Sequence, residues 1–223
     1  MCKSEISEVN INGEVIQRSR CIKYLDADLD TRLSLKDRKC RIAVGNLHKL
    51  KCIWKGLTLG AAKTIAIRFV ISHLGYANVL YSGLPNTEVS KLQRIQNITA
   101  KTITGARKYD SSTEVPKTLH WLPIHTAGIE FKVLTPVFGI MLGLAPHYLC
   151  DLIDVTRPTR SGLRSGNIEN TLIVPFIKYR TVAGRTFSVF GPKAWNNLPD
   201  DLRSATDYKR FKRELKTYMF QRY

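Results

Sequence analysis

The segment between Pro85 and Gly105 constrains the fold more than any other part of the chain. It predicts one amphipathic helix, because Pro85 suits a helix start, Gly105 suits a helix end, and apolar residues recur at helical spacing. The apolar side is formed by Val89, Leu92, Ile95 and Ile103. The opposite side carries Lys91, Arg94 and Lys101. Such a helix packs on a core and presents its cations outward, either to an anion or only to solvent.

Helical spacing also precedes this segment. From residue 34 onward a first helix is predicted, and three of its polar residues, spaced seven apart, form a second basic stripe. The stripe consists of Arg41, His48 and Lys55, with Lys51 beside it. A second helix is predicted from Thr58, as N-cap, to about Tyr81. It is apolar nearly all round, so we expect it to be the buried centre of the helical part.

The remainder of the chain is also predicted to be largely helical. A short helix leads into residues 119–123, and a long apolar helix follows, kinked near residue 132 by Pro136 and ended by Ala145-Pro146. Residues 156–170 combine arginines with Pro, Ser and Gly, which is typical of a basic linker. Residues 172–175 have the pattern of a short strand, and residues 185–196 and 207–220 that of helices.

The beginning of the chain has a different pattern. Residues 9–16 alternate around Asn12-Gly13, a pair that suits a two-residue turn, and so predict a β-hairpin. Residues 21–29 predict one further strand. This is too little sheet to be stable alone. The predicted fold is therefore mainly α, a helical bundle preceded by a small antiparallel β element that either packs on the helices or forms the edge of a larger sheet.

The charge of the chain favours a polyanionic partner. The 223 residues include 35 Lys and Arg and 18 Asp and Glu, a formal charge of +17. Residues 1–30 hold four basic and six acidic residues, so the rest holds 31 and 12, a net +19. Such a surface favours nucleic acid over an anionic membrane. No signal peptide or bilayer-spanning run is evident, so we expect an intracellular protein, nuclear or cytoplasmic, with reduced cysteines.

No self-sufficient active site is evident in the sequence. Asp26, Asp28 and Asp30 alternate in the predicted strand, where they form either a metal site or an acidic sheet edge. His147 and Cys150 lie three apart, as a base and a nucleophile do, but no third group orients the histidine, so a helix face is the simpler interpretation. We expect no catalytic residue, metal ligand, cofactor or small-molecule ligand in this chain.

Phosphate binding requires little more than convergent cations with amides nearby. The predicted phosphate contacts are Lys91, Arg94 and Lys101, with Arg41, His48 and Lys55 as the second stripe. The neighbouring Gln93, Gln96 and Asn97 either bond to sugars and phosphates or pair with nearby backbone. The predicted partner is an RNA/DNA duplex or single-stranded nucleic acid.

Several different short motifs follow one another from residue 83 onward. They are GLP at 83–85, KLQRIQN at 91–97, LHWLP at 119–123, APHYL at 145–149, LRS at 163–165, GPKAWNNLP at 191–199, and FK and LK at 211–212 and 215–216. Together they resemble the region beyond the catalytic palm in reverse transcriptases of non-LTR (LINE-type) retrotransposons, particularly the jockey and chicken-repeat types. The resemblance covers nearly the whole chain.

The resemblance implies three parts and a parent activity, RNA-directed DNA polymerisation. Residues 1–33 would be the palm edge, 34–122 the helical thumb that holds template and primer, and 123–223 a helical C-terminal region. The family's primer-grip triplet Tyr-Leu-Gly is here Tyr24-Leu25-Asp26, which brings a negative charge toward a primer phosphate. The family's aromatic-Ala-Asp-Asp motif, which holds Mg²⁺, does not occur in the sequence. The resemblance therefore implies a fragment that binds nucleic acid without polymerising DNA.

Two other functions are compatible with the sequence. The basic faces also fit an acidic protein partner, which would make the chain an interaction module retained from a decayed element. The three aspartates at positions 26, 28 and 30 would instead fit a small metal-dependent enzyme.

Overall fold

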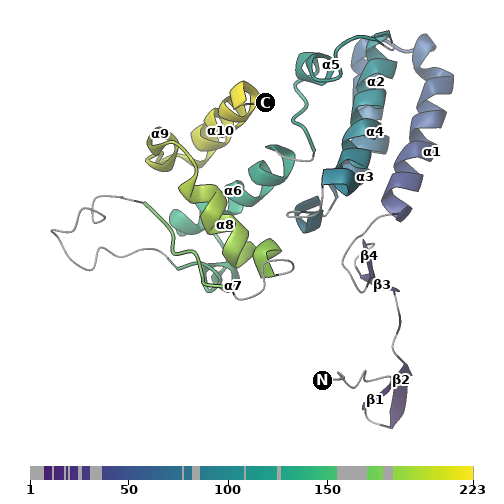
Figure 1. Ribbon diagram of the computed structural model, residues 1–223. Helices are drawn as coiled ribbons and strands as arrows, with labels where there is room; N and C mark the ends of the chain where they lie inside the picture. Colours follow the sequence, from purple (N-terminus) through teal and green to yellow (C-terminus); the bar gives the residue numbers. More distant parts are fainter. Residues whose placement is uncertain are drawn as a thin grey trace.

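The computed structural model describes residues 8–11, 13–17, 19, 21–24, 27–30, 37–76, 78–81, 86–107, 109–124, 127–154, 170–177 and 183–222. Within these residues the chain is mainly helical, with small antiparallel β elements before the helices, as predicted (Figure 1). Residues 156–169 of the predicted basic linker lie outside the described residues. So do Leu25 and Asp26 of the primer-grip-like triplet.

The predicted hairpin is present, and a second hairpin follows it. Strands β1 (Glu8–Ile11) and β2 (Glu14–Gln17) pair antiparallel around Gly13, whose φ of +88° suits glycine. Strands β3 (Cys21–Tyr24) and β4 (Ala27–Asp30) form a second antiparallel pair with Tyr24 opposite Ala27. The prediction of one strand over residues 21–29 is therefore wrong. Residues 21–29 contain no Gly, Pro or Asn, and the prediction did not count Asp26, which lies between the two strands, as a turn residue.

The first helical layer comes from residues 37–81. Helix α1 (Asp37–Ile53) continues into the 3₁₀ turn η1 (Trp54–Gly56). Helix α2 (Leu59–Ala66) begins after Thr58, whose hydroxyl accepts a hydrogen bond from the Ala61 amide at 3.3 Å, as expected of an N-cap. A π-helical turn η2 (Ile67–Ile71), α3 (Ser72–Gly75) and the 3₁₀ turn η3 (Asn78–Tyr81) complete the layer.

This layer is amphipathic, so the prediction that residues 58–81 are buried on all sides is wrong. One face is buried and consists of Ala62, Ala66, Val70 and Leu74. Leu59, Ile67 and Phe69 are exposed, with Phe69 57% accessible. The prediction relied on the high hydrophobic content of the segment. The buried residues lie four apart, a spacing that indicates a helix buried on one side only.

Helix α4 (Asn86–Thr104) is the segment that the sequence predicted most firmly. Its predicted apolar side, with Val89, Leu92, Ile95 and Ile103, is buried. Gly105 ends it with a φ of +67°, the Ala106 amide donating to the Lys101 carbonyl at 3.1 Å and the Gly105 amide to the Thr102 carbonyl at 3.4 Å. This is a Schellman ending, which requires the left-handed conformation that glycine adopts easily.

The C-terminal half contains α5 (Glu114–Thr118), α6 (Ala127–Met141), α7 (His147–Cys150), α8 (Phe187–Asn196), α9 (Asp200–Arg203) and α10 (Tyr208–Arg222). Helix α6 runs through Pro136 and ends earlier than predicted. Its end is set by Gly143, with a φ of +67°, and by a hydrogen bond of 2.8 Å from the Leu144 amide to the Gly139 carbonyl. The glycine rather than Ala145-Pro146 therefore terminates the helix.

Helices α6, α8 and α10 enclose the largest core (Figure 1). Phe138 stacks on Phe211 with ring centroids 4.0 Å apart, and the fully buried Trp195 lies beside both. Gly191 allows α8 to approach α6, since a Cβ at that position would lie 3.1 Å from Val137 Cγ2. A larger side chain would crowd Val137, which explains why α8 has a glycine at this position although glycine weakens a helix.

The predicted strand over residues 172–175 is absent, and a side chain takes its place. Leu172 makes only an isolated bridge. Its amide donates to Asn196 Oδ1 at 3.0 Å, and Asn196 Nδ2 donates to its carbonyl at 2.8 Å. The asparagine of α8 therefore satisfies the backbone groups that a neighbouring strand would satisfy.

Candidate nucleic-acid interface

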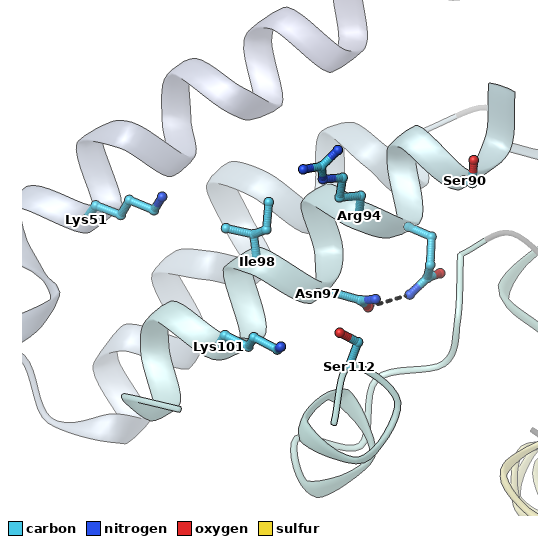
Figure 2. A pocket seen from close by; sticks show the side chains of 8 residues that line it. Lys51, Ser90, Arg94, Asn97, Ile98, Lys101 and Ser112 are labelled. Carbon is cyan, nitrogen blue, oxygen red and sulfur yellow. Dashed lines mark hydrogen bonds between the residues drawn. The ribbon is translucent and has the colours of Figure 1, made fainter. Parts of the chain in front are cut away.

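The outer side of α4 faces a pocket of about 710 Å³ (Figure 2). It is lined by Lys51, Ser90, Gln93, Arg94, Asn97, Ile98, Lys101 and Ser112. Most of these residues come from α4, whereas Lys51 comes from α1 and Ser112 from the loop before α5. Figure 2 shows the side chains of Lys51, Arg94 and Lys101 arranged around this space. Three cations from two helices thus border one concave surface.

The structure brings together some of the predicted phosphate contacts and not others. Arg94 and Lys101 line the same pocket. Lys91 is exposed on α4 but does not belong to the lining. The second stripe, made of Arg41, His48 and Lys55, is exposed along α1 and η1 and also lies outside the lining. A role in binding phosphate stays a prediction for all six residues.

Lys51 is the pocket residue that sequence reasoning missed. The sequence placed it only beside the second stripe, because Arg41, His48 and Lys55 share the more regular spacing. Its opposition to α4 depends on how α1 and α4 pack, and that packing joins Leu47 of α1 with Leu92 and Ile95 of α4 in one buried cluster. Helix packing of this kind is not readable from a single helical pattern.

Lys101 has a second role in holding the loop that follows α4. Its Nζ donates a hydrogen bond of 2.7 Å to the carbonyl of Asp110. The same loop is closed by the Asp110 amide, which donates to the Arg107 carbonyl at 3.1 Å, and by the Arg107 amide, which donates to Asp110 Oδ2 at 2.5 Å. The loop that carries Ser112 into the pocket is therefore fastened to the basic side of α4.

The amide side chains of α4 mostly serve the protein itself. Gln96 is 1% exposed, and its Nε2 donates to the Leu122 carbonyl at 2.9 Å. The Ile124 amide donates to Gln93 Oε1 at 2.9 Å and to Gln96 Oε1 at 3.3 Å. Of the two interpretations left open by the sequence, pairing with backbone is therefore correct for Gln96. Gln93 and Asn97 are bonded to each other at 2.8 Å and also line the pocket.

The charge in the pocket is of one sign. Among the residues that the structure describes, its lining has three basic side chains and no carboxylate. In the described part of the chain, neither Lys51 nor Arg94 takes part in an ion pair with an acidic side chain. The positive potential of these two side chains favours an anion such as a phosphate group. Hydroxyl groups of Ser90 and Ser112 add further hydrogen-bonding capacity.

The other candidate residues of the sequence lie in the β elements and at α7. Asp28 and Asp30 lie in β4, whereas Asp26 falls outside the described residues. Cys150 Sγ lies 3.8 Å from the Ala145 carbonyl at the start of α7, in a hydrogen bond to backbone. Residues 8–222, with the gaps given above, contain no cluster of three His, Cys, Asp or Glu able to hold a metal ion.

Comparison with models of protein families, with curated proteins and with solved structures finds no match to this chain. The relation to reverse transcriptases therefore stays a prediction from sequence motifs. Among the described helices, none combines the length and apolar character needed to cross a bilayer.

Proposed function

We propose that this chain binds nucleic acid through the pocket between α1 and α4, as the thumb-like fragment of a non-LTR retrotransposon reverse transcriptase. The observation that carries the proposal is that Lys51, Arg94 and Lys101, from two helices, line one pocket. Cations that converge from different helices define a place for a phosphate, whereas cations scattered over a surface do not.

The binding proposed is independent of base sequence. Lysine and arginine neutralise phosphates and release counterions, so the affinity falls steeply as salt rises. The resemblance to the reverse transcriptase thumb supports template and primer as the ligand. Polymerisation is not part of the proposal, because the sequence contains no aromatic-Ala-Asp-Asp motif to hold Mg²⁺.

A charge-reversal experiment with a matched control tests the proposal. The double variant Lys51→Glu/Arg94→Glu reverses two pocket cations and leaves the Lys101 hydrogen bond to the loop intact. The control Lys209→Glu/Arg213→Glu makes the same change in net charge on the exposed side of α10. Binding of a labelled oligonucleotide at low salt should be lost in the pocket variant and largely kept in the control. Equal losses in both variants would mean that net charge, not the pocket, retains the nucleic acid.

An acidic protein partner is the second candidate function. The observation that favours a protein partner is the exposure of large apolar side chains on α2 and η2, namely Leu59, Ile67 and Phe69. Competition separates the two functions at the pocket. Polyglutamate and an oligonucleotide of equal charge should displace a bound nucleic acid equally if only charge is recognised, and the oligonucleotide should be far superior if the pocket is built for phosphates.

A further inference from the structure

A solvent-exposed aromatic side chain belongs to the loop that joins the basic side of α4 to Ser112 of the pocket. Tyr109 is 92% exposed, whereas the large side chains on the inner face of α4 are buried. Burial of an aromatic side chain removes about 150–250 Å² of its surface from water, which is favourable. Tyr109 does not gain this free energy within the protein. The ring of Tyr109 is therefore available to a ligand.

The backbone at Tyr109 is held next to a pocket cation. The adjacent Asp110 offers its carbonyl to Lys101 Nζ at 2.7 Å, so Tyr109 is one residue away from the point of attachment. The turn that contains Tyr109 is closed on both sides by hydrogen bonds between Arg107 and Asp110, of 3.1 and 2.5 Å. Two residues further along the chain from Asp110, Ser112 lines the pocket. Tyr109 consequently lies in a braced turn, one residue before the carbonyl that a pocket cation holds and three residues before a residue of the pocket lining.

We propose that the pocket takes a single-stranded segment, with a backbone phosphate at Lys51, Arg94 and Lys101 and an unpaired base stacked on Tyr109. The proposal rests on the proposed nucleic-acid function and specifies its ligand. A positively charged groove flanked by an aromatic ring is the arrangement by which proteins hold single strands without reading their sequence. In a duplex each base is already stacked between its neighbours, so an intact duplex cannot offer a base to the ring.

The same reasoning distinguishes nucleic acid from other polyanions. An acidic peptide or inorganic polyphosphate satisfies the three cations but has no base to place on the ring. Stacking of a base on an aromatic side chain adds about 1–3 kcal/mol to binding, independently of the base. The contribution of Tyr109 should therefore be visible only with ligands that carry bases.

The test uses two single strands of equal length and charge, an oligothymidylate and an abasic strand, with the full chain and fluorescence anisotropy as the readout. Tyr109→Ala should weaken oligothymidylate binding by about 5- to 150-fold, the range that corresponds to stacking of one base. Binding of the abasic strand should be unchanged. Tyr109→Phe keeps the ring and should match the original protein. Because residue 109 is exposed, the variants should keep the fold, which circular dichroism checks.

The outcomes separate this inference from the function on which it rests. If Tyr109→Ala binds both strands as the original protein does, or loses both equally, the stacking inference is wrong. If Lys51→Glu/Arg94→Glu also leaves both strands bound, the proposed function fails with it. Loss of binding in that pocket variant, together with no effect of Tyr109→Ala, would refute the stacking partner alone and leave a phosphate-binding pocket.

Discussion

If the pocket binds nucleic acid as proposed, the salt dependence of binding reflects the number of phosphates that the pocket contacts. Neutralising two of its three cations, as in Lys51→Gln/Arg94→Gln, removes two of these contacts and leaves Lys101 attached to its loop. Each phosphate contact to a single strand contributes about −0.7 to the slope of log affinity against log salt concentration. The slope for the double variant should therefore be shallower than that of the original protein by about 1.4.

This difference corresponds to a large change over an ordinary range of salt. Between 50 and 200 mM, three pocket contacts weaken binding by about 20-fold and one remaining contact by about threefold. Contacts made elsewhere on the basic chain add equally to both proteins and cancel in the difference. Anisotropy titrations of an oligothymidylate at several salt concentrations give both slopes directly.

The control is Lys209→Gln/Arg213→Gln, which removes the same two charges from α10. Its slope should equal that of the original protein, because these side chains lie outside the pocket. The reasoning is refuted if the pocket variant and the original protein give parallel lines, or if the α10 variant changes the slope as much as the pocket variant does.

Three further predictions concern stability and the loop. Gln96→Leu should lower the free energy of unfolding by about 1–3 kcal/mol in urea titrations, because the partly buried Leu122 carbonyl loses the donor that the buried Gln96 supplies. A loss below about 0.5 kcal/mol, the usual limit for surface changes, would contradict this. Gly45→Ala, at an open position within α1, should raise the free energy of unfolding by about 0.5–1 kcal/mol. Gly191→Leu should lower the free energy of unfolding by about 1–3 kcal/mol, because the new side chain meets Val137. Changes of the opposite sign would be incompatible with the packing. Lys101→Met should accelerate tryptic cleavage after Arg107 by up to about tenfold, because the loop loses a charged donor; an unchanged rate would mean that the hydrogen bond does not brace the loop.

The sequence predicted those parts of the fold whose signals are local. Helix α4 has an apolar period, and Gly105 ends it with the left-handed conformation that its ending requires. Thr58 caps α2 as expected, and Gly13 lies in the turn of the first hairpin. In each case a few consecutive residues contain the complete physical reason for the structure.

The features that were missed depend on contacts between distant residues. Asn196 replaces a strand by bonding to both backbone groups of Leu172, and no local pattern announces a side chain in that role. Gly143 was passed over in favour of a proline, although its conformation ends α6. At the pocket, Arg94 and Lys101 followed from the face of one helix, but Lys51 required the packing of α1 on α4.

The hydrogen bonds of Gln93 and Gln96 allow the exchange of one amide proton, that of Ile124, to report on the opening of two parts of the molecule. The Ile124 amide is held by Gln93 and Gln96, and it lies just before α6 enters the core formed with α8 and α10. Its hydrogen-exchange rate therefore depends both on local unfolding of α4 and on whether the segment that leads into α6 stays packed against α4. Slow exchange at this one position would indicate that the basic layer and the C-terminal core open together, and fast exchange would indicate that they open separately.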